Sequence, residues 1–115
     1  MKTLSFKENY IEDASMGGNI EGDRIEMRGW DLVSFQYIWT GSPAGIVDIQ
    51  VSNKSNPTNP EDWTTVNVDG DNPSGSADNS VLELETGSRW VRAIYTATSG
   101  SGTLSVHYSL KSLGK

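Results

Sequence analysis

Leu32–Trp39 (LVSFQYIW) and Thr103–Lys111 (TLSVHYSLK) are the two stretches that decide the fold class. Along each, large apolar side chains alternate with other residues. One face of the first stretch collects Val33, Phe35, Tyr37 and Trp39, and one face of the second collects Leu104, Val106, Tyr108 and Leu110. A period of two, kept over about four to eight residues, is typical of a β-strand with one buried face. Both stretches are therefore predicted to be half-buried strands.

The same period continues through the rest of the chain. It predicts strands at Ile46–Ser52, Trp63–Val68, Val81–Glu85 and Trp90–Ala97, with two weaker ones at Leu4–Lys7 and Ile20–Met27. No stretch carries a helical pattern. About seven or eight short strands separated by turn formers are typical of an antiparallel β-sandwich. We therefore expect an all-β chain with a single antiparallel β-sandwich of jelly-roll or immunoglobulin-like type. A small closed barrel is the alternative.

Glycine, proline and small polar residues separate the predicted strands. Thr40–Gly45 joins two of them, and Ser99–Gly102 is predicted to be a short glycine hairpin before the last strand. Asn53–Asp62 and Asp69–Ser80 are longer polar loops. The first 18 residues are polar and end in two glycines, so we expect a flexible N-terminal arm over residues 1–18. The sandwich domain would then span residues 19–115.

Composition excludes several classes of function. The chain has 115 residues, 15 acidic and 9 basic, and a net charge of -6. An acidic chain is a poor match for nucleic acid, because phosphate contacts need clustered lysine and arginine. The absence of cysteine excludes thiolate zinc sites, iron–sulfur centres and cysteine nucleophiles. Met1–Ser15 lacks the apolar run of a secretory signal, and no apolar stretch approaches the roughly 20 residues of a membrane span.

Catalytic candidates are few, and each has a simpler interpretation. The one histidine, His107, lies in a predicted strand on the face opposite Leu104 and Val106. Glu83 and Glu85 share one strand face, where they are expected to be solvated rather than placed across a cleft as glycosidase acids are. We therefore expect a protein that is not an enzyme.

An oxygen-rich loop leaves calcium open as a ligand. Residues 69–78 hold Asp69, Asp71, Asn72 and Asp78, but their spacing departs from the EF-hand pattern. Irregular calcium loops occur in β-sandwiches. Otherwise no cofactor is expected.

Aromatic side chains are the most informative feature for binding. Trp39 and Trp63 flank loops, and exposed tryptophans in such places can stack on sugar rings. The competing interpretation is that they fill the core or an interface between subunits. Trp39 and Trp63 are thus candidate glycan-contact residues.

Charge is segregated along the chain. Residues 61–85 hold seven acids and no base, whereas residues 86–115 hold four bases and no acid. Opposite fields on one small domain can steer self-association. Arg89 and Arg92 are therefore candidate interface residues that would pair with the acidic stretch of another subunit. The simpler interpretation is a solvated strand face.

The last third of the chain resembles the ending of small virion proteins of tailed phages. Arg89–Thr96 (RWVRAIYT) matches a strand of the pattern W/Y-V-R-h-h-Y-T, in which h is hydrophobic, and Thr98–Leu104 (TSGSGTL) matches the glycine–serine hairpin and the final G-T-L strand that follow it in those proteins. Upstream, Tyr37–Gly45 (YIWTGSPAG), Asp48–Ser52 and Asp62–Val66 fit the same pattern. The resemblance covers roughly residues 32–110 and supplies no catalytic residues.

This resemblance implies a non-enzymatic structural protein of the virion, made in the host cytoplasm. It would be a capsid decoration or accessory protein, a head-fibre base or a tail component. Its expected partners are further copies of itself, as a homo-oligomer and by expectation a trimer, and other virion proteins such as the major capsid protein. The alternative function is a carbohydrate-binding β-sandwich module that uses exposed tryptophans on glycans.

Overall fold

The computed structural model describes residues 4–66 and 78–113, and within them almost all regular structure is β-strand. One sheet, here called sheet A, has the order β1-β9-β4-β7. Its strands are β1 (Leu4–Ser15), β9 (Thr103–Lys111), β4 (Leu32–Trp39) and β7 (Asp78–Glu85). The alternating stretches that are β4 and β9 lie at its centre. Their ends agree with the sequence prediction.

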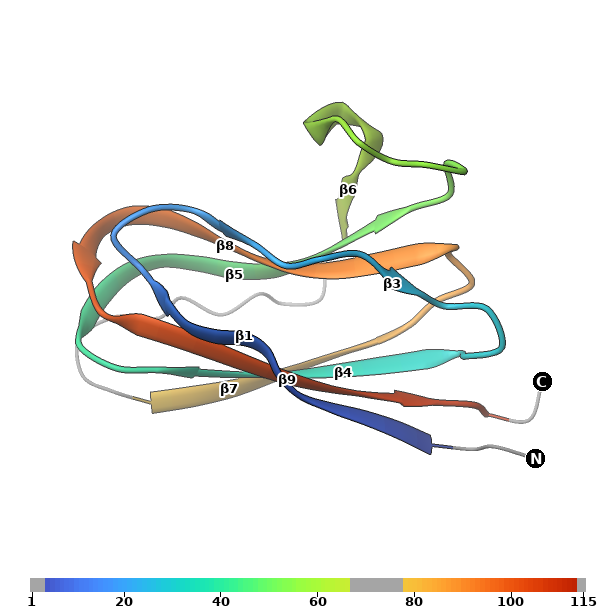
Figure 1. Ribbon diagram of the computed structural model, residues 1–115, viewed down its shortest axis with the longest axis horizontal. Coiled ribbons are helices and arrows are strands. Elements are labelled where there is room, and N and C mark those ends of the chain that lie inside the picture. Colours follow the sequence, from blue (N-terminus) through green and yellow to red (C-terminus); the bar gives the residue numbers. More distant parts are fainter. Residues whose placement is uncertain (1–3, 67–77, 114–115) are drawn as a thin grey trace.

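The second sheet, sheet B, has the order β2-β8-β5-β6, and β3 also pairs with β8. Its strands are β2 (Ile20–Glu21), β3 (Ile25–Glu26), β8 (Trp90–Ser101), β5 (Ser42–Ser52) and β6 (Thr64–Val66). Every pairing in both sheets is antiparallel. Figure 1 shows the two sheets stacked as layers. The predicted antiparallel β-sandwich is confirmed, with nine strands among the described residues in place of seven or eight.

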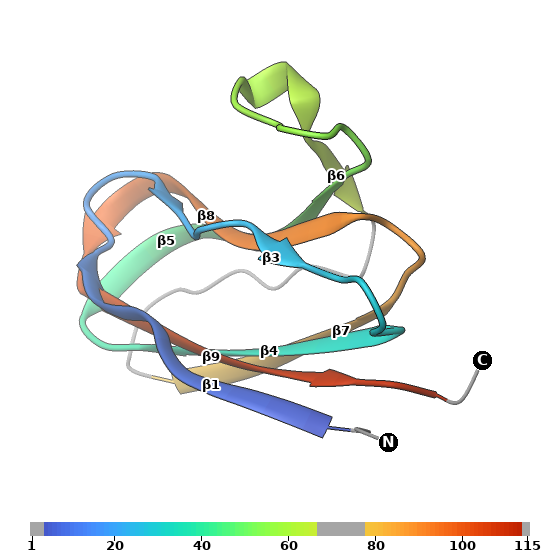
Figure 2. The same ribbon diagram turned by 45° about the vertical axis from the view of Figure 1, so that its right-hand side comes forward.

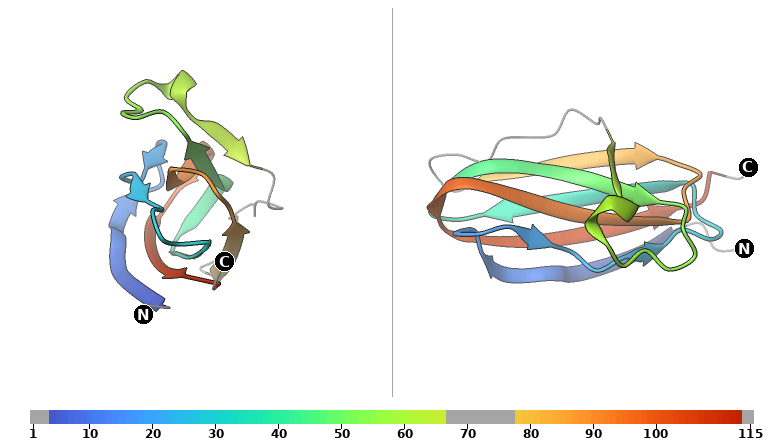
Figure 3. Two further views of the ribbon diagram at one scale, coloured as in Figure 1. Left: turned by 90° about the vertical axis from the view of Figure 1, so that its right-hand side faces the viewer. Right: turned by 90° about the horizontal axis from the view of Figure 1, so that it is seen from above.

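Figure 3 shows the two layers from the end and from above. Buried hydrophobic residues of both layers form one core cluster. Alternate residues of the four central strands supply fully buried side chains: Val33, Phe35, Tyr37, Val47, Ile49, Val91, Ala93, Leu104 and Val106. Four aromatic rings, those of Tyr10, Phe35, Tyr37 and Tyr108, pack in one cluster with neighbouring centroids 5.1–6.3 Å apart. Burying this apolar area is the main favourable contribution to folding.

The predicted hairpin at Ser99–Gly102 is wrong, because β8 and β9 belong to different sheets. β8 continues to Ser101, which pairs with Ser42 of β5, and the chain then crosses to sheet A at Gly102. The β4–β5 connection crosses in the opposite direction at Gly41. Both glycines have positive φ, and a Cβ on Gly102 would lie 2.0 Å from the carbonyl oxygen of Thr40. The two crossings thus pack directly against each other, as only glycine permits.

The N-terminal segment is part of the sandwich and is not a flexible arm over its described residues, 4–18. β1 pairs with β9 from Leu4 to Ser15, and Met16 is fully buried. The prediction failed because β1 does not keep a period of two. From Lys7 to Ile11 the strand uses four residues where β9 uses two, so it contains a bulge, and a smaller irregularity follows. Bulges break the alternation by which a strand is recognised in sequence.

Candidate binding groove

The two tryptophans predicted as exposed platforms are buried. Trp39 is 4% exposed at the end of β4, and Trp63 is 9% exposed immediately after the 3-10 turn η1 (Pro60–Asp62). Neither ring offers a free face for a sugar. Trp39 lies on the same face of β4 as Val33, Phe35 and Tyr37, and this face points into the core. Its burial follows from this face and not from the loop beside it.

Arg92 covers Trp63 and is occupied within the chain. Its guanidinium carbon lies 4.3 Å from the centre of the Trp63 ring. Its Nε and one Nη both donate to Oε1 of Gln50, at 2.9 and 2.6 Å, and its other Nη lies 3.6 Å from a carboxylate oxygen of Glu21. With its side chain only 12% exposed, Arg92 is not a free interface residue. We call Arg92, Trp63, Gln50 and Glu21 the arginine clasp.

A second cation–π contact holds the polar loop at Asn53–Asp62, which stands above sheet B at one end of the sandwich (Figure 2). The guanidinium of Arg24 lies 4.7 Å from the Trp90 ring and donates to Asn56, while Trp90 Nε1 donates to the carbonyl of Lys54 at 2.9 Å. Together with the clasp, these contacts explain why sheet B carries tryptophans at this end. They are structural rather than free for a ligand.

The carboxylate of Asp62 organises the same loop. It accepts backbone N–H bonds from Asn59 and Thr58 and a bond from Lys54 Nζ, each at 3.0 Å. These bonds, led by that from Asn59, lower the pKa of Asp62 because they favour the charged form. Arg89, by contrast, has an exposed side chain, and its backbone N–H donates to Asn53 Oδ1 at 2.9 Å. Of the two arginines proposed as interface residues, Arg89 alone is available.

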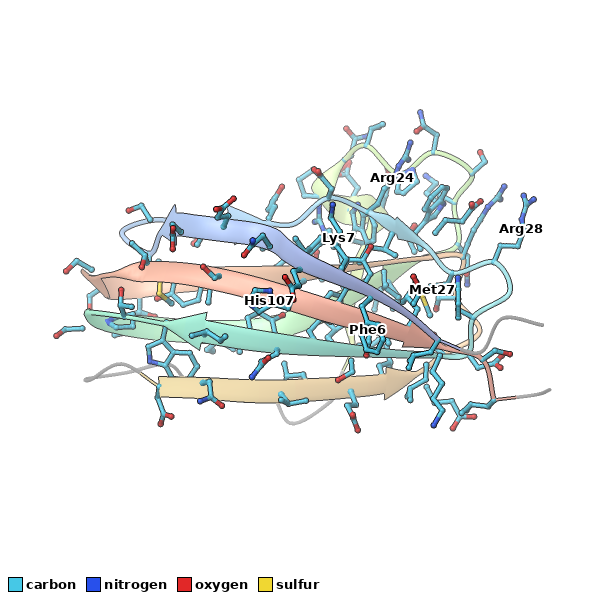
Figure 4. All side chains as sticks on the ribbon, turned by 60° about the horizontal axis from the view of Figure 1, so that its bottom comes forward. Phe6, Lys7, Arg24, Met27, Arg28 and His107 are labelled. Carbon is cyan, nitrogen blue, oxygen red and sulfur yellow. The ribbon has the colours of Figure 1, made fainter. Side chains whose placement is uncertain are left out.

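A groove of about 570 Å³ lies on the outer face of sheet A. Its floor is formed by polar side chains that point away from the core: Ser34, Gln36, His107 and Ser109. Apolar residues of the outer strands and β4 stand around them: Phe6, Ile38 and Val81. Lys7, Glu8 and Tyr108 complete the lining. Figure 4 shows Phe6, Lys7 and His107 on the adjoining strands β1 and β9.

His107 is held in place by the bulge in β1. Its Nδ1 accepts the backbone N–H of Asn9 at 2.9 Å, and Asn9 has the positive φ of +54° that the bulge requires. A ring that accepts at Nδ1 carries its proton on Nε2 when it is neutral. Ser105 lies two residues before His107 in β9. Its Oγ accepts the backbone N–H of Asp13, which is the second residue of β1 with a positive φ. Side chains of β9 thus replace the backbone partners that the bulges remove.

The apolar residues of this face are unusually exposed. Phe6 is 71% exposed and Val81 52%, and Leu4 and Ile38 are also exposed. Gathered apolar side chains on a surface mark interaction sites more often than scattered ones do. Sequence reasoning missed Phe6 because it lay in the expected arm, although Leu4 and Phe6 have the parity of a strand face.

The remaining predicted chemistry is not assembled in the described residues. Glu83 and Glu85 are both exposed on β7, as expected for a solvated face. No group of three histidine or acidic side chains in residues 4–66 and 78–113 is placed to hold a metal ion. The predicted calcium loop at residues 69–78 falls outside the described residues except for Asp78. Among the described residues, no helix is long and apolar enough to cross a membrane.

No protein-family model and no curated protein matches the sequence. The fold, however, is shared with solved structures. One is the SPBc2 prophage-derived protein YomS, with a TM-score of 0.59, 12% identity and coverage of 97% of each chain. Another is the PBSX exported protein XepA, with a TM-score of 0.66 and 12% identity. That match covers 96% of this chain but 38% of XepA.

A third similar structure is that of a carbohydrate-binding module. CBM29_1, a family 29 carbohydrate-binding module from Piromyces equi, matches with a TM-score of 0.57 and 11% identity, over 97% of this chain and 94% of the module. At such identities the likeness is one of fold. The described residues therefore form a β-sandwich of a type found in a prophage-derived protein and in a carbohydrate-binding module.

Proposed function

We propose that this chain is a non-enzymatic structural protein of a phage particle, which associates with itself and with neighbouring virion proteins. The observation that carries the proposal is the fold similarity to YomS over 97% of both chains. The similarity extends over almost all of this sequence and almost all of YomS. The strand and turn pattern of residues 32–110, which resembles small tailed-phage virion proteins, supports the same function.

The surface charges support an assembly role, but with Arg89 and without Arg92. Arg92 lies in the arginine clasp, so it does not serve the charge pairing between subunits. Asp78 and Glu83 on β7 remain exposed, as does Arg89 before β8. Exposed opposite charges of this kind steer encounter and orient partners more than they add affinity. Affinity would come from apolar surface outside the sheet A face, which is exposed at Ile46 of β5 and at Leu113 after β9.

Two measurements test this proposal. The first is absolute mass by light scattering after size exclusion, over a wide range of concentrations, against a monomer of 12.5 kDa. The second asks whether the chain bands with phage particles purified from an induced culture of its source strain. A discrete oligomer and co-banding, with a trimer as the expected state, would support the proposal. A chain that stays in the soluble fraction while particles form would overturn it.

Carbohydrate binding is the second candidate function, and a specific observation favours it. CBM29_1 shares the fold over 94% of its length. The version of this function that uses Trp39 and Trp63 is withdrawn because both rings are buried. Any sugar must therefore find its aromatic contact elsewhere on the molecule.

A further inference from the structure

The groove on sheet A has the size and the mixture of groups of a ligand site. Its volume of about 570 Å³ falls within the range of roughly 300–1,000 Å³ typical of small-ligand pockets. Such sites combine apolar walls with a few convergent polar groups that fix orientation. Here the walls are Phe6, Ile38 and Val81, and the floor presents hydroxyl, amide and imidazole groups.

The floor offers hydrogen bonds without a dominant charge. Gln36 can both donate and accept, and the hydroxyls of Ser34 and Ser109 can do the same. Asn9 occupies Nδ1 of His107, which leaves Nε2–H as the donor of the neutral ring. The charged residues of the lining, Lys7 and Glu8, offset each other. This set of groups suits a ligand that is uncharged and rich in hydroxyls.

Phe6 adds an aromatic surface beside that floor. Its ring is 71% exposed on an edge strand, and Ser109 of β9 is its cross-strand partner. Exposing a phenylalanine this far is unfavourable unless something covers it. An aromatic ring next to hydroxyl and amide groups can take the apolar face of a sugar ring while the polar groups bind its hydroxyls.

The same composition argues against a protein as the occupant. The centres of protein interfaces are depleted in serine and lysine and rich in tyrosine, tryptophan and arginine. The groove has two serines on its floor and a lysine and a glutamate in its lining; its aromatic residues are Phe6 and Tyr108, and neither tryptophan nor arginine lines it. We infer that this groove binds a neutral glycan chain, with Phe6 as the stacking residue and Gln36, His107 and Ser109 as hydrogen-bonding residues. The inference deepens the second candidate function and is independent of particle assembly.

Binding and its location are tested together. The full chain is first screened against a printed panel of neutral oligosaccharides, including cellohexaose, mannohexaose and maltohexaose. The strongest probe is then titrated into ¹⁵N-labelled protein while amide shifts are followed by NMR. We expect saturable shifts at residues of β1, β4 and β9 that line the groove. No binding to any member of the panel at millimolar concentration would overturn the inference, as would shifts confined to sheet B.

Variants separate the groove from the rest of the surface. Phe6→Ala removes an exposed ring and should raise Kd at least tenfold, about 1.4 kcal/mol, while the fold is kept. Gln36→Ala should raise Kd severalfold. Ile46→Ala is the matched control, because Ile46 is an exposed apolar residue of sheet B and should leave Kd unchanged. Equal loss of affinity in Phe6→Ala and Ile46→Ala would contradict the assignment.

NMR spectra of the protein alone at several concentrations show whether the groove binds a second copy of the chain instead of a sugar. If the groove residues shift with protein concentration when no sugar is present, and Phe6→Ala abolishes that change, the groove is a self-association face and the glycan inference fails. Failure of glycan binding would leave particle association untouched, since co-banding with particles is measured separately.

Discussion

The arginine clasp makes a quantitative prediction about stability. In Arg92→Met, the apolar stem stays while the guanidinium and all its polar contacts are lost. Hydrogen bonds from a charged donor contribute about 1.5–3 kcal/mol. Stacking of the cation on Trp63 adds about 0.5–2 kcal/mol. The ion pair to Glu21 adds little, because that carboxylate is 64% exposed and screened by solvent.

The expected loss is therefore about 3 kcal/mol of unfolding free energy. For a domain of this size, that corresponds to a fall in Tm of roughly 12 °C. A domain with ordinary stability of about 5–15 kcal/mol should survive this change, so the variant can be measured. Urea unfolding followed by tryptophan fluorescence is the suitable assay, since Trp63 lies directly under the substituted side chain.

Two variants serve as controls. Arg89→Met removes an equal charge from an exposed side chain and should cost less than about 0.5 kcal/mol. Glu21→Gln removes the ion pair alone and should cost about as little. The opposite result is that Arg92→Met lowers the unfolding free energy by less than about 1 kcal/mol, or by no more than Arg89→Met does. That result would refute the assignment of Arg92 to the interior of the fold and restore it as a candidate interface residue.

Three other outcomes can be checked. Burial raises the pKa of all four tyrosines in the folded state. Their contribution to the free energy of unfolding is therefore complete below about pH 10, the value in the unfolded chain, and is lost as the pH rises through the folded values. Absorbance at alkaline pH should show the phenols ionising together with unfolding. Gly102→Ala should lower the free energy of unfolding by more than about 2 kcal/mol, or prevent folding, because Gly102 has a positive φ and packs against Thr40. Gly18 has open space around it, so Gly18→Ala should leave the Tm unchanged in thermal melts. The pKa of Asp62 is lowered in the folded state, so its contribution to the free energy of unfolding is present above its unfolded pKa of about 4 and is lost as the pH falls through its folded pKa. Asp62→Asn should therefore reduce the loss of stability at acid pH, measured in urea titrations.

The fold class could be predicted because the central strands of the two sheets keep a strict period of two. In β4, every second side chain from Val33 to Trp39 is buried, as the alternation requires. What sequence could not supply was which strands pair. The stretch Ser99–Gly102 has the composition of a hairpin, but Ser101 pairs with Ser42 of β5. Thr103 instead accepts the backbone N–H of Thr40 and pairs with Ser15 of β1. Local composition sets a change of direction, whereas the choice of partner depends on contacts far away in the chain.

The tryptophans illustrate two different reasons for a wrong prediction. Trp39 could have been placed correctly, because its parity in β4 is that of the core. Trp63 could not, because what covers it is an arginine from β8, 29 residues further along the chain. A side chain that looks exposed beside a polar loop becomes buried once a distant cation stacks on it. Burial of aromatic residues at sheet edges is thus a property of tertiary contacts.

The groove was hidden in the sequence for a reason that also bears on how it is built. Its walls come from β4 and from the two edge strands of sheet A, β1 and β7, and β1 has no recognisable period because of its bulges. Yet the first bulge is what brings Asn9 to His107 and fixes which ring nitrogen carries the proton. Before the bulge, Phe6 faces outward beside Ser109, and after it Ile11 faces the core opposite Val106. The second irregularity, between Ile11 and Ala14, is the one that shifts the parity of the strand, so that both residues pack on the core opposite Val106 and Leu104.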